Sequence, residues 1–248
     1  MADVKHRHEE IAEALRADIA AGTYPAGKAL PAETQLAHRF GASVPTVRLA
    51  LGRLQNDGLI EKVPGNGNYV LRPFERITYT NDKSVTDGLT PTTTTLTVEI
   101  TTTEVEADVQ LSTQLRVPVG TRLNRYVFLS RQGTSPHSLA QVYVPCSVAE
   151  LTVPPTGWSP LGDDIRAQLV DRGIRPTSTV VHIAARLPEP SEERQLRIGS
   201  GTAVLAIRRR SMDADGRVIE AAVLVLPGHR SEAVFSTHMP VDEAEAKK

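Results

Sequence analysis

The sequence contains one cysteine, and aromatic residues make up only 4% of the chain. Cys146 alone excludes an internal disulfide bond and a metal site built from several cysteines. The histidines at positions 137, 182, 229 and 238 are scattered without the spacing of zinc ligands, so we expect no metal and no cofactor. No nucleophile motif or catalytic pair is recognisable, and we therefore do not expect an enzyme.

Long apolar runs are also missing. No stretch of 18 or more apolar residues occurs, which argues against a membrane-spanning helix. The N-terminal residues MADVKHRHEEIAEAL carry charges where a secretion signal needs an apolar core, so we expect a cytoplasmic protein. A formal net charge of −1 gives the whole chain no attraction for nucleic acid, so such a role must depend on where the charges lie.

The sequence does have enough length and enough apolar residues, 40% of 248, for two packed domains. Its first part predicts three helices followed by a β-hairpin. The helices end near Gly22, Gly41 and Gly58, and the third begins at Ser43, a good N-cap. The inner faces follow helical spacing through three sets of residues: Ile11, Leu15 and Ile19; Leu36, Ala37 and Phe40; Val47, Ala50, Leu51 and Leu54.

Two short β patterns at 59–63 and 68–71 flank a Pro-Gly-Asn-Gly turn. Asn-Gly is typical of a tight hairpin because both residues tolerate positive φ. A helix at 43–57 with arginines on its outer face fits the DNA major groove, and a glycine-tipped hairpin beside it can approach the duplex closely. Together they predict a winged helix-turn-helix. Residues 36–72 carry a modest excess of cations over anions, which supports this prediction.

The remaining sequence predicts an antiparallel sheet with helices on one side. Residues 73–91 are polar and weakly patterned, as is typical of a linker, and TTTTLTVEITTTEV then predicts a long strand. STQLRVPVGTRL at 112–123 resembles ERQLRIGSGTAV at 193–204, and each precedes two strands joined by a turn. We therefore expect a helix-turn-hairpin unit twice, with a further helix at 161–172 and a strand at 177–187.

The segment IAEALRADIAAGTYPAGKALPAETQLAHRFGASVPTVRLALGRLQNDGLIEKVPGNGNYV, residues 11–70, resembles the DNA-binding domain of the GntR family of bacterial transcriptional regulators. The resemblance implies DNA contacts from the start of the second helix, the third helix and the hairpin tip. Together with the outer face of the third helix, it gives the predicted DNA-binding residues Thr34, Ser43, Pro45, Thr46, Arg48, Arg53, Gly65, Asn66 and Gly67. A solvated helix surface is the alternative for the two arginines.

Three positions depart from the pattern of that family. Val44 and Thr34 stand where arginine is common, and Pro45 stands where threonine or serine is common. A bidentate arginine contact to a base is worth about 1–3 kcal/mol of discrimination. We therefore expect DNA binding to be retained, with an operator that differs from the common family sequence.

The second part resembles the ligand-binding (UTRA) domain of the HutC-type branch of the same family, whose fold is similar to that of chorismate lyase. The motifs concerned are PVGT, GSGT, VYVP, LVDRGIRP and RRSMDADGRVIE. The resemblance implies an effector pocket between the helices and the sheet. The predicted effector-binding residues are Arg125, Tyr143, Arg208, Glu220 and Leu226. For any one of these arginines, an exposed strand face is an equally good explanation.

Tyrosines that this branch often has are missing here. Leu226 replaces one, and Gly162 or Asp163 replaces another on the central helix. Because aromatic hydroxyls hold sugar phosphates in the relatives, the resemblance implies a less polar effector in this chain.

The predicted fold class is α+β, with a winged helix-turn-helix at 1–72, a linker at 73–91, a UTRA domain at 92–240 and a disordered tail at 241–248. The predicted function is that of a homodimeric repressor, which binds an inverted-repeat operator in double-stranded DNA and responds to a small-molecule effector. The alternative is a DNA-binding regulator whose second domain only dimerises or recruits a protein partner. No membrane partner is expected.

Overall fold

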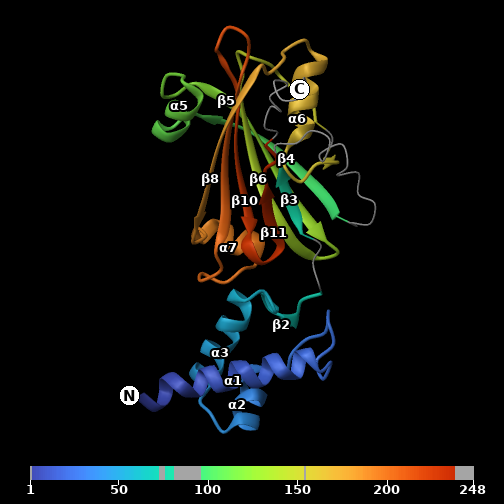
Figure 1. Ribbon diagram of the computed structural model, residues 1–248, viewed down its shortest axis with the longest axis vertical. Coiled ribbons are helices and arrows are strands. Elements are labelled where there is room, and N and C mark those ends of the chain that lie inside the picture. Colours follow the sequence, from blue (N-terminus) through green and yellow to red (C-terminus); the bar gives the residue numbers. More distant parts are fainter. Residues whose placement is uncertain (1, 73–75, 81–95, 154, 238–248) are drawn as a thin grey trace, which may run out of the picture.

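The computed structural model describes residues 2–72, 76–80, 96–153 and 155–237, without the side chains of residues 2–6. These residues form two domains that follow one another along the long axis (Figure 1). We call the N-terminal domain the head and the C-terminal one the sheet domain. No helix among the described residues is long and apolar enough to cross a membrane.

The head contains the three helices and the hairpin that the sequence predicts. They are α1 (Ala2–Ala20), α2 (Glu33–Phe40), α3 (Val44–Asn56), β1 (Ile60–Val63) and β2 (Gly67–Val70). Gly41 ends α2 in the left-handed conformation, with φ 56°. The shared core consists of Ile11, Ala12, Leu15, Leu30, Leu36, Ala37, Val47, Ala50, Leu51, Leu54, Ile60 and Val70. The predicted winged helix-turn-helix is thus confirmed.

The sheet domain is built on seven antiparallel strands in the order β7-β4-β5-β6-β10-β9-β8. The strands are β4 (Leu96–Glu106), β5 (Arg122–Gln132), β6 (Ser135–Pro145), β7 (Thr156–Gly157), β8 (Ser178–Arg186), β9 (Val204–Met212) and β10 (Val218–Pro227). The helices are α5 (Val109–Leu115), α6 (Asp163–Asp171) and α7 (Pro190–Leu196). The predicted antiparallel sheet and the α+β fold class are confirmed.

The helices cover both faces of the sheet, so the predicted one-sided arrangement is wrong. On one face, called the α6 face, α6 packs against a core that includes Phe128 and Val142. On the opposite face, called the α5 face, Leu115 of α5 packs near Tyr143, and Leu196 of α7 packs elsewhere on the same side. The physical reason lies in strands such as β10, whose apolar residues are buried at successive positions and therefore need cover on both sides.

The sequence duplication is a structural repeat, as predicted. The unit α5-β5-β6 recurs as α7-β9-β10. Both short helices end at an arginine in the left-handed conformation, Arg116 with φ 56° and Arg197 with φ 52°. Because the left-handed residue follows the helix at the same place in both copies, the two copies have the same turn from helix to strand.

Part of the predicted linker is a strand. Within residues 73–91, β3 (Ile77–Thr80) pairs in parallel with β11 (Ser231–Val234), which follows a short 3-10 helix at Gly228–Arg230. Ile77 and Tyr79 are buried in the core of the α6 face. The rest of the predicted linker, apart from Arg76, lies outside the described residues, as does the predicted tail at 241–248.

Candidate functional site

The first turn of α3 presents small polar groups at the surface. The Ser43 hydroxyl accepts a hydrogen bond from the Thr46 N–H at 3.3 Å, and the two hydroxyl oxygens lie 2.7 Å apart. Pro45 sits in the first turn, where its missing N–H costs no helical hydrogen bond. Ser43 and Pro45 are exposed. This end of α3 can therefore enter the major groove of DNA without any change in the packing of the helix on the head.

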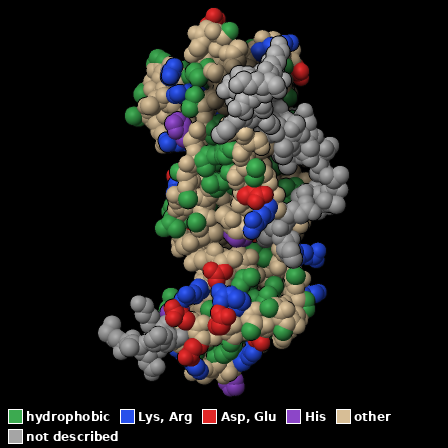
Figure 2. Space-filling model, viewed as in Figure 1, with side chains coloured by type: hydrophobic (Ala, Val, Ile, Leu, Met, Phe, Trp, Pro, Cys, Tyr) green, Lys and Arg blue, Asp and Glu red, His purple; other side chains and the backbone are tan. Residues whose placement is uncertain are grey.

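The two arginines predicted on the outer face of α3 each have an acidic partner within the head. Arg48 donates to Glu33 of α2, with Nη2 at 2.7 Å and Nε at 3.1 Å from Oε2, and its side chain is 61% exposed. Arg53 pairs with Glu9 of α1 at 2.6 Å. Figure 2 shows Lys or Arg and Asp or Glu side chains interspersed over the head. Exposed pairs of this kind contribute little to stability because water and salt screen them, so a phosphate can displace the carboxylate.

The hairpin tip forms an exposed wing beside α3. Gly65 and Gly67 adopt positive φ, 77° and 97°, and no neighbouring atom lies within 4 Å of the space where a Cβ would stand. Asn66 is exposed but does not share the positive φ, so Gly65 and Gly67 take that role instead of Asn66 and Gly67. Thr34, the remaining predicted contact, is exposed in the first turn of α2.

The C-terminal half of α3 faces the sheet domain. Arg48, Leu49, Gly52 and Arg53 line a hollow of about 470 Å³ together with Gly199 and Ser200, which belong to the turn between α7 and β9. Leu49 is 57% exposed within this hollow. The first turn of α3 is thus open, whereas the helix from Arg48 onward approaches the other domain.

Hydrogen bonds fix the end of α3 to that turn. The Asn56 side-chain oxygen accepts from the Gly201 N–H at 3.2 Å, and its backbone carbonyl accepts from the Thr202 hydroxyl at 3.4 Å. A Cβ on Gly199 or Gly201 would lie 2.0 or 2.4 Å from the Asn56 amide, so a larger residue there would have to displace that side chain. We call these contacts the joint. A second contact supports it, since Ser135 donates to Glu61 of β1 at 2.7 Å.

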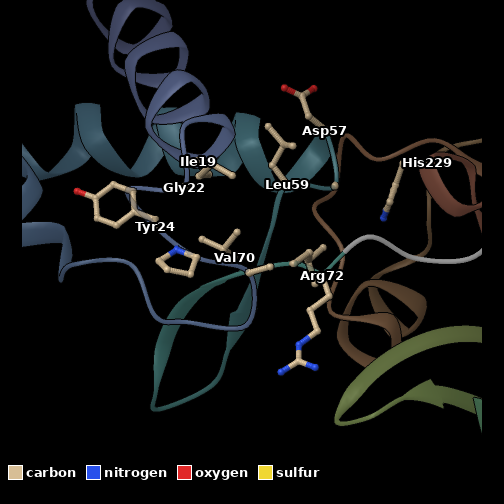
Figure 3. A pocket seen from close by; sticks show the side chains of 12 residues that line it. Ile19, Gly22, Tyr24, Asp57, Leu59, Val70, Arg72 and His229 are labelled. Atoms are coloured by element: carbon tan, nitrogen blue, oxygen red, sulfur yellow. The ribbon is translucent and has the colours of Figure 1, made fainter. Parts of the chain in front are cut away.

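A hollow of about 410 Å³ lies on another side of this domain contact (Figure 3). Tyr24, Leu59 and Arg72 of the head line it, and His229 contributes from the sheet domain. Burial lowers the pKa of His229 to about 4, and the nearby charges of Arg230 and His137 act in the same direction. The imidazole is therefore neutral near pH 7, and it fills space against Gly58 without adding charge.

The structure does not bring the predicted effector-binding residues together. Arg125, Tyr143 and Arg208 belong to the α5 face, where Arg125 lies opposite Tyr143 on neighbouring strands. Glu220 and Leu226 belong to the α6 face. Those two are also about 20 Å apart along β10, because six residues of strand separate them. One pocket cannot include all five residues.

Glu220 takes part in a buried ion network on the α6 face. Its carboxylate accepts from Arg209 Nη2 at 2.8 Å, and Arg209 Nη1 also donates to Asp163 of α6 at 3.2 Å. Arg166 lies 3.7 Å from the other Glu220 oxygen. Burial lowers the pKa of the Arg209 guanidinium, but the Glu220 and Asp163 carboxylates outweigh it and raise the pKa overall. Two cations and two anions balance, so the network itself leaves no net charge to attract an ion.

The sequence reasoning missed Arg209 and Arg166 as partners of Glu220, and Asp163 as the second acid that they contact. Strand alternation does separate Arg209 from Arg208 and Arg210, as expected from the RRR run. Asp163, the acid in α6 that Arg209 contacts, could not be predicted because the sequence does not show that α6 packs over β9. On the α5 face, Arg208 and Arg210 line a further hollow of about 520 Å³ under α5.

Two family descriptions match most of the chain. Residues 7–70 match "Bacterial regulatory proteins, gntR family", and residues 86–232 match the UTRA domain.

Full-length relatives have the same organisation. The HTH-type transcriptional regulator Rv0792c of Mycobacterium tuberculosis is 29% identical, over 93% of this chain and 85% of the relative. The histidine utilization repressor of Pseudomonas aeruginosa is 27% identical, over 93% and 91%. The crystal structure of PhnF from Mycobacterium smegmatis has the same fold, with a TM-score of 0.54, 24% identity and coverage of 93% of this chain and 99% of that one. The first of these relatives is named as a transcriptional regulator and the second as a repressor.

Proposed function

The chain belongs to the GntR family and carries the UTRA domain of its HutC-type members. On this basis we propose that it is a homodimeric repressor that binds an inverted-repeat operator. A small molecule bound in the UTRA domain changes its affinity for that operator. That the chain is a transcriptional regulator follows from the family itself. We assign DNA binding to residues 1–72, and dimerisation and effector binding to residues 92–240.

The observation that carries the DNA-binding proposal is the open first turn of α3 beside the glycine-tipped wing. Ser43 and Thr46 lie in the first turn of α3, outside the hollow beside the sheet domain, whereas Arg48 lines that hollow but keeps its side chain 61% exposed. A short helix presented in this way enters the major groove with its N-terminal residues toward the bases, while the wing approaches the backbone. In a two-fold dimer the two copies of α3 would stand about 34 Å apart, one turn of DNA.

Selection from a pool of random duplexes by the full chain tests this proposal. We expect enrichment of a two-fold symmetric sequence whose half-site centres lie about 10 base pairs apart, or a multiple of one helical turn. Because Thr34 and Val44 replace arginines of the family pattern, the half-site should differ from the common family sequence. A Ser43→Ala, Thr46→Ala chain is the control and should lose the enrichment. Failure of the parent chain to enrich any sequence at low salt would contradict the proposal.

The joint between the domains gives the regulator a way to couple its two sites. Asn56 ends the recognition helix, and its partners Gly201 and Thr202 lie just before β9. An effector that favours one arrangement of β9 within the sheet domain can therefore favour one orientation of the head relative to that domain. Coupling of this kind requires only that the ligand binds the two arrangements with different affinity.

Weakening the joint should free the head. Asn56→Ala removes the Gly201 contact, and Gly201→Val, made separately with Asn56 kept, places a side chain where the Asn56 amide lies. With hydrogen bonds worth about 0.5–1.5 kcal/mol each, we expect about a tenfold shift toward separated domains. Small-angle scattering should then show a larger radius of gyration. Asn66→Ala, on the exposed wing, is the matched control and should leave the radius unchanged. An unchanged radius in the Asn56 and Gly201 variants would show that the joint does not hold the head.

A further inference from the structure

The hollow under α5 is lined by an unusual concentration of cations. It has a volume of about 520 Å³ and lies between α5 and the strands β8 and β9. Arg208 and Arg210 of β9 contribute to its floor with His182 of β8, which lies opposite Arg208. Gln110 and Gln114 reach it from α5. Figure 2 shows Lys or Arg and His side chains close together at the position of α5 in Figure 1.

The two arginines have no acidic partner in the part of the chain that the structure describes, and neither makes a side-chain hydrogen bond there. The Arg210 Nε is buried without an acceptor among the described atoms. Their neighbours on β10 are Val223 and Ala221, which carry no charge. The sequence of α5, VQLSTQL, also contains no acid.

This arrangement contrasts with other arginines of the chain. Arg48, Arg122 and Arg186 each contact a carboxylate at 2.7 Å, although all three are at least partly exposed. Arg209 stands between Arg208 and Arg210 in the sequence and is bonded to two acids on the other face. Positive charge without a counter-charge in a polar hollow favours an anion, because a carboxylate or phosphate accepts bonds from the guanidinium fork.

We propose that this hollow, the Arg208–Arg210 pocket, binds a small organic molecule through a phosphate or carboxylate group. Residues two apart on a strand lie about 7 Å from each other, so both guanidinium groups can reach one oxyanion from opposite sides. The volume suits a metabolite-sized ligand. His182, Gln110 and Gln114 supply further polar groups for the remainder of the molecule. The proposal rests on the regulator function above, and it assigns the effector to the face opposite Glu220.

The pocket is far from the head, so DNA held by α3 does not supply the anion. Figure 1 places α5 at the end of the sheet away from α1, α2 and α3. The connection to the head runs through β9 itself. Arg208 lies six residues after Thr202, a partner of Asn56 in the joint, which corresponds to about 20 Å of strand. A ligand held by Arg208 and Arg210 therefore acts on the strand whose preceding turn contacts the end of α3.

The expected effector differs from the one implied by the family resemblance. The missing tyrosines concern Leu226 and the Gly162–Asp163 region, which lie on the α6 face or beside α6. Their loss says nothing about the α5 face. An anionic effector is therefore compatible with those departures.

Calorimetric titration and thermal shift with the full chain test the pocket. The probes are inorganic phosphate, glycerol 3-phosphate and succinate, each at constant ionic strength set with sodium chloride. We expect saturable binding and a raised melting temperature with at least one probe, since a ligand that binds only the folded state stabilises it. A response to the first two identifies a phosphate group, and a response to succinate identifies a carboxylate. Either response supports the pocket only if the arginine variants weaken it.

Arg208→Gln and Arg210→Gln should each weaken binding about tenfold, and the double variant should weaken it about a hundredfold. Arg175→Gln, at an exposed arginine just before β8, is the matched control and should bind like the parent. Melting without probe checks that the variants are folded. Lack of binding by all three probes, or equal binding by the double variant, overturns the proposal. DNA selection is measured without probe, so failure of the pocket and failure of the repressor function are separately visible.

Discussion

Replacing Arg48 with alanine is expected to lower the affinity for operator DNA about a hundredfold. A bidentate arginine contact contributes about 1–3 kcal/mol, and a two-fold dimer loses the contact twice. The side chain is 61% exposed, and Arg48 is not one of the residues of the buried core of the head. The substitution should therefore leave the fold intact, so that the loss reports a missing DNA contact.

Glu33 provides an independent check of the same assignment. In the free protein its carboxylate holds the Arg48 guanidinium at 2.7 Å, and DNA has to compete with it. Glu33→Gln keeps the size of the side chain and removes the charge, so affinity should rise severalfold at low salt. The gain should shrink as salt increases, because the competing attraction is electrostatic.

Fluorescence anisotropy with the selected duplex measures both effects. Arg16→Ala is the control, since Arg16 is also an ion-paired, partly exposed arginine of the head but lies on α1. It should bind within about twofold of the parent, as expected for a surface change away from the duplex. If Arg48→Ala bound as tightly as the parent, α3 would not be the element that contacts DNA.

Local signals explain why the head was predictable from sequence. The Ser43 cap, the glycines that end the helices and the apolar spacing of α3 all act within a few residues. They therefore predict the helix boundaries and the buried face without knowledge of tertiary contacts. Even the error at the wing was local. The turn places Gly65 and Gly67 at positive φ, where the Asn66-Gly67 pair had been expected to do so.

The sheet domain shows what local signals leave open. Alternation correctly separated Arg208 and Arg210 from Arg209, but which helix covers which face depends on packing between distant parts of the chain. The predicted effector set therefore mixed residues from two faces. The strand Ile77–Thr80 was missed for a similar reason, since it has only four residues and its partner lies about 150 positions later.

Arg209→Ala is expected to destabilise the sheet domain by about 3–5 kcal/mol, because it leaves the buried Glu220 carboxylate with only Arg166, at 3.7 Å, as a cation partner. Arg209 is 3% exposed and Glu220 is 1% exposed, so water cannot replace the lost bonds without opening the space beneath α6. Asp163 loses its 3.2 Å contact in the same step. Thermal and urea unfolding followed by circular dichroism measure the change.

Two further variants test whether the loss of stability comes from the ion network: Arg208→Ala, and Arg209→Met combined with Glu220→Leu. Arg208→Ala changes the same residue type one position earlier, on the exposed side of the strand, and should alter stability by no more than about 0.5 kcal/mol. Arg209→Met combined with Glu220→Leu removes both charges of the central pair, so it should recover much of the loss, as replacing a buried ion pair by apolar groups often does. Arg166 remains beside Asp163 at 4.0 Å in that variant. Equal stability of the Arg209→Ala and Arg208→Ala proteins would mean that the network is not an essential part of the core, and Glu220 would then be available to a ligand on the α6 face.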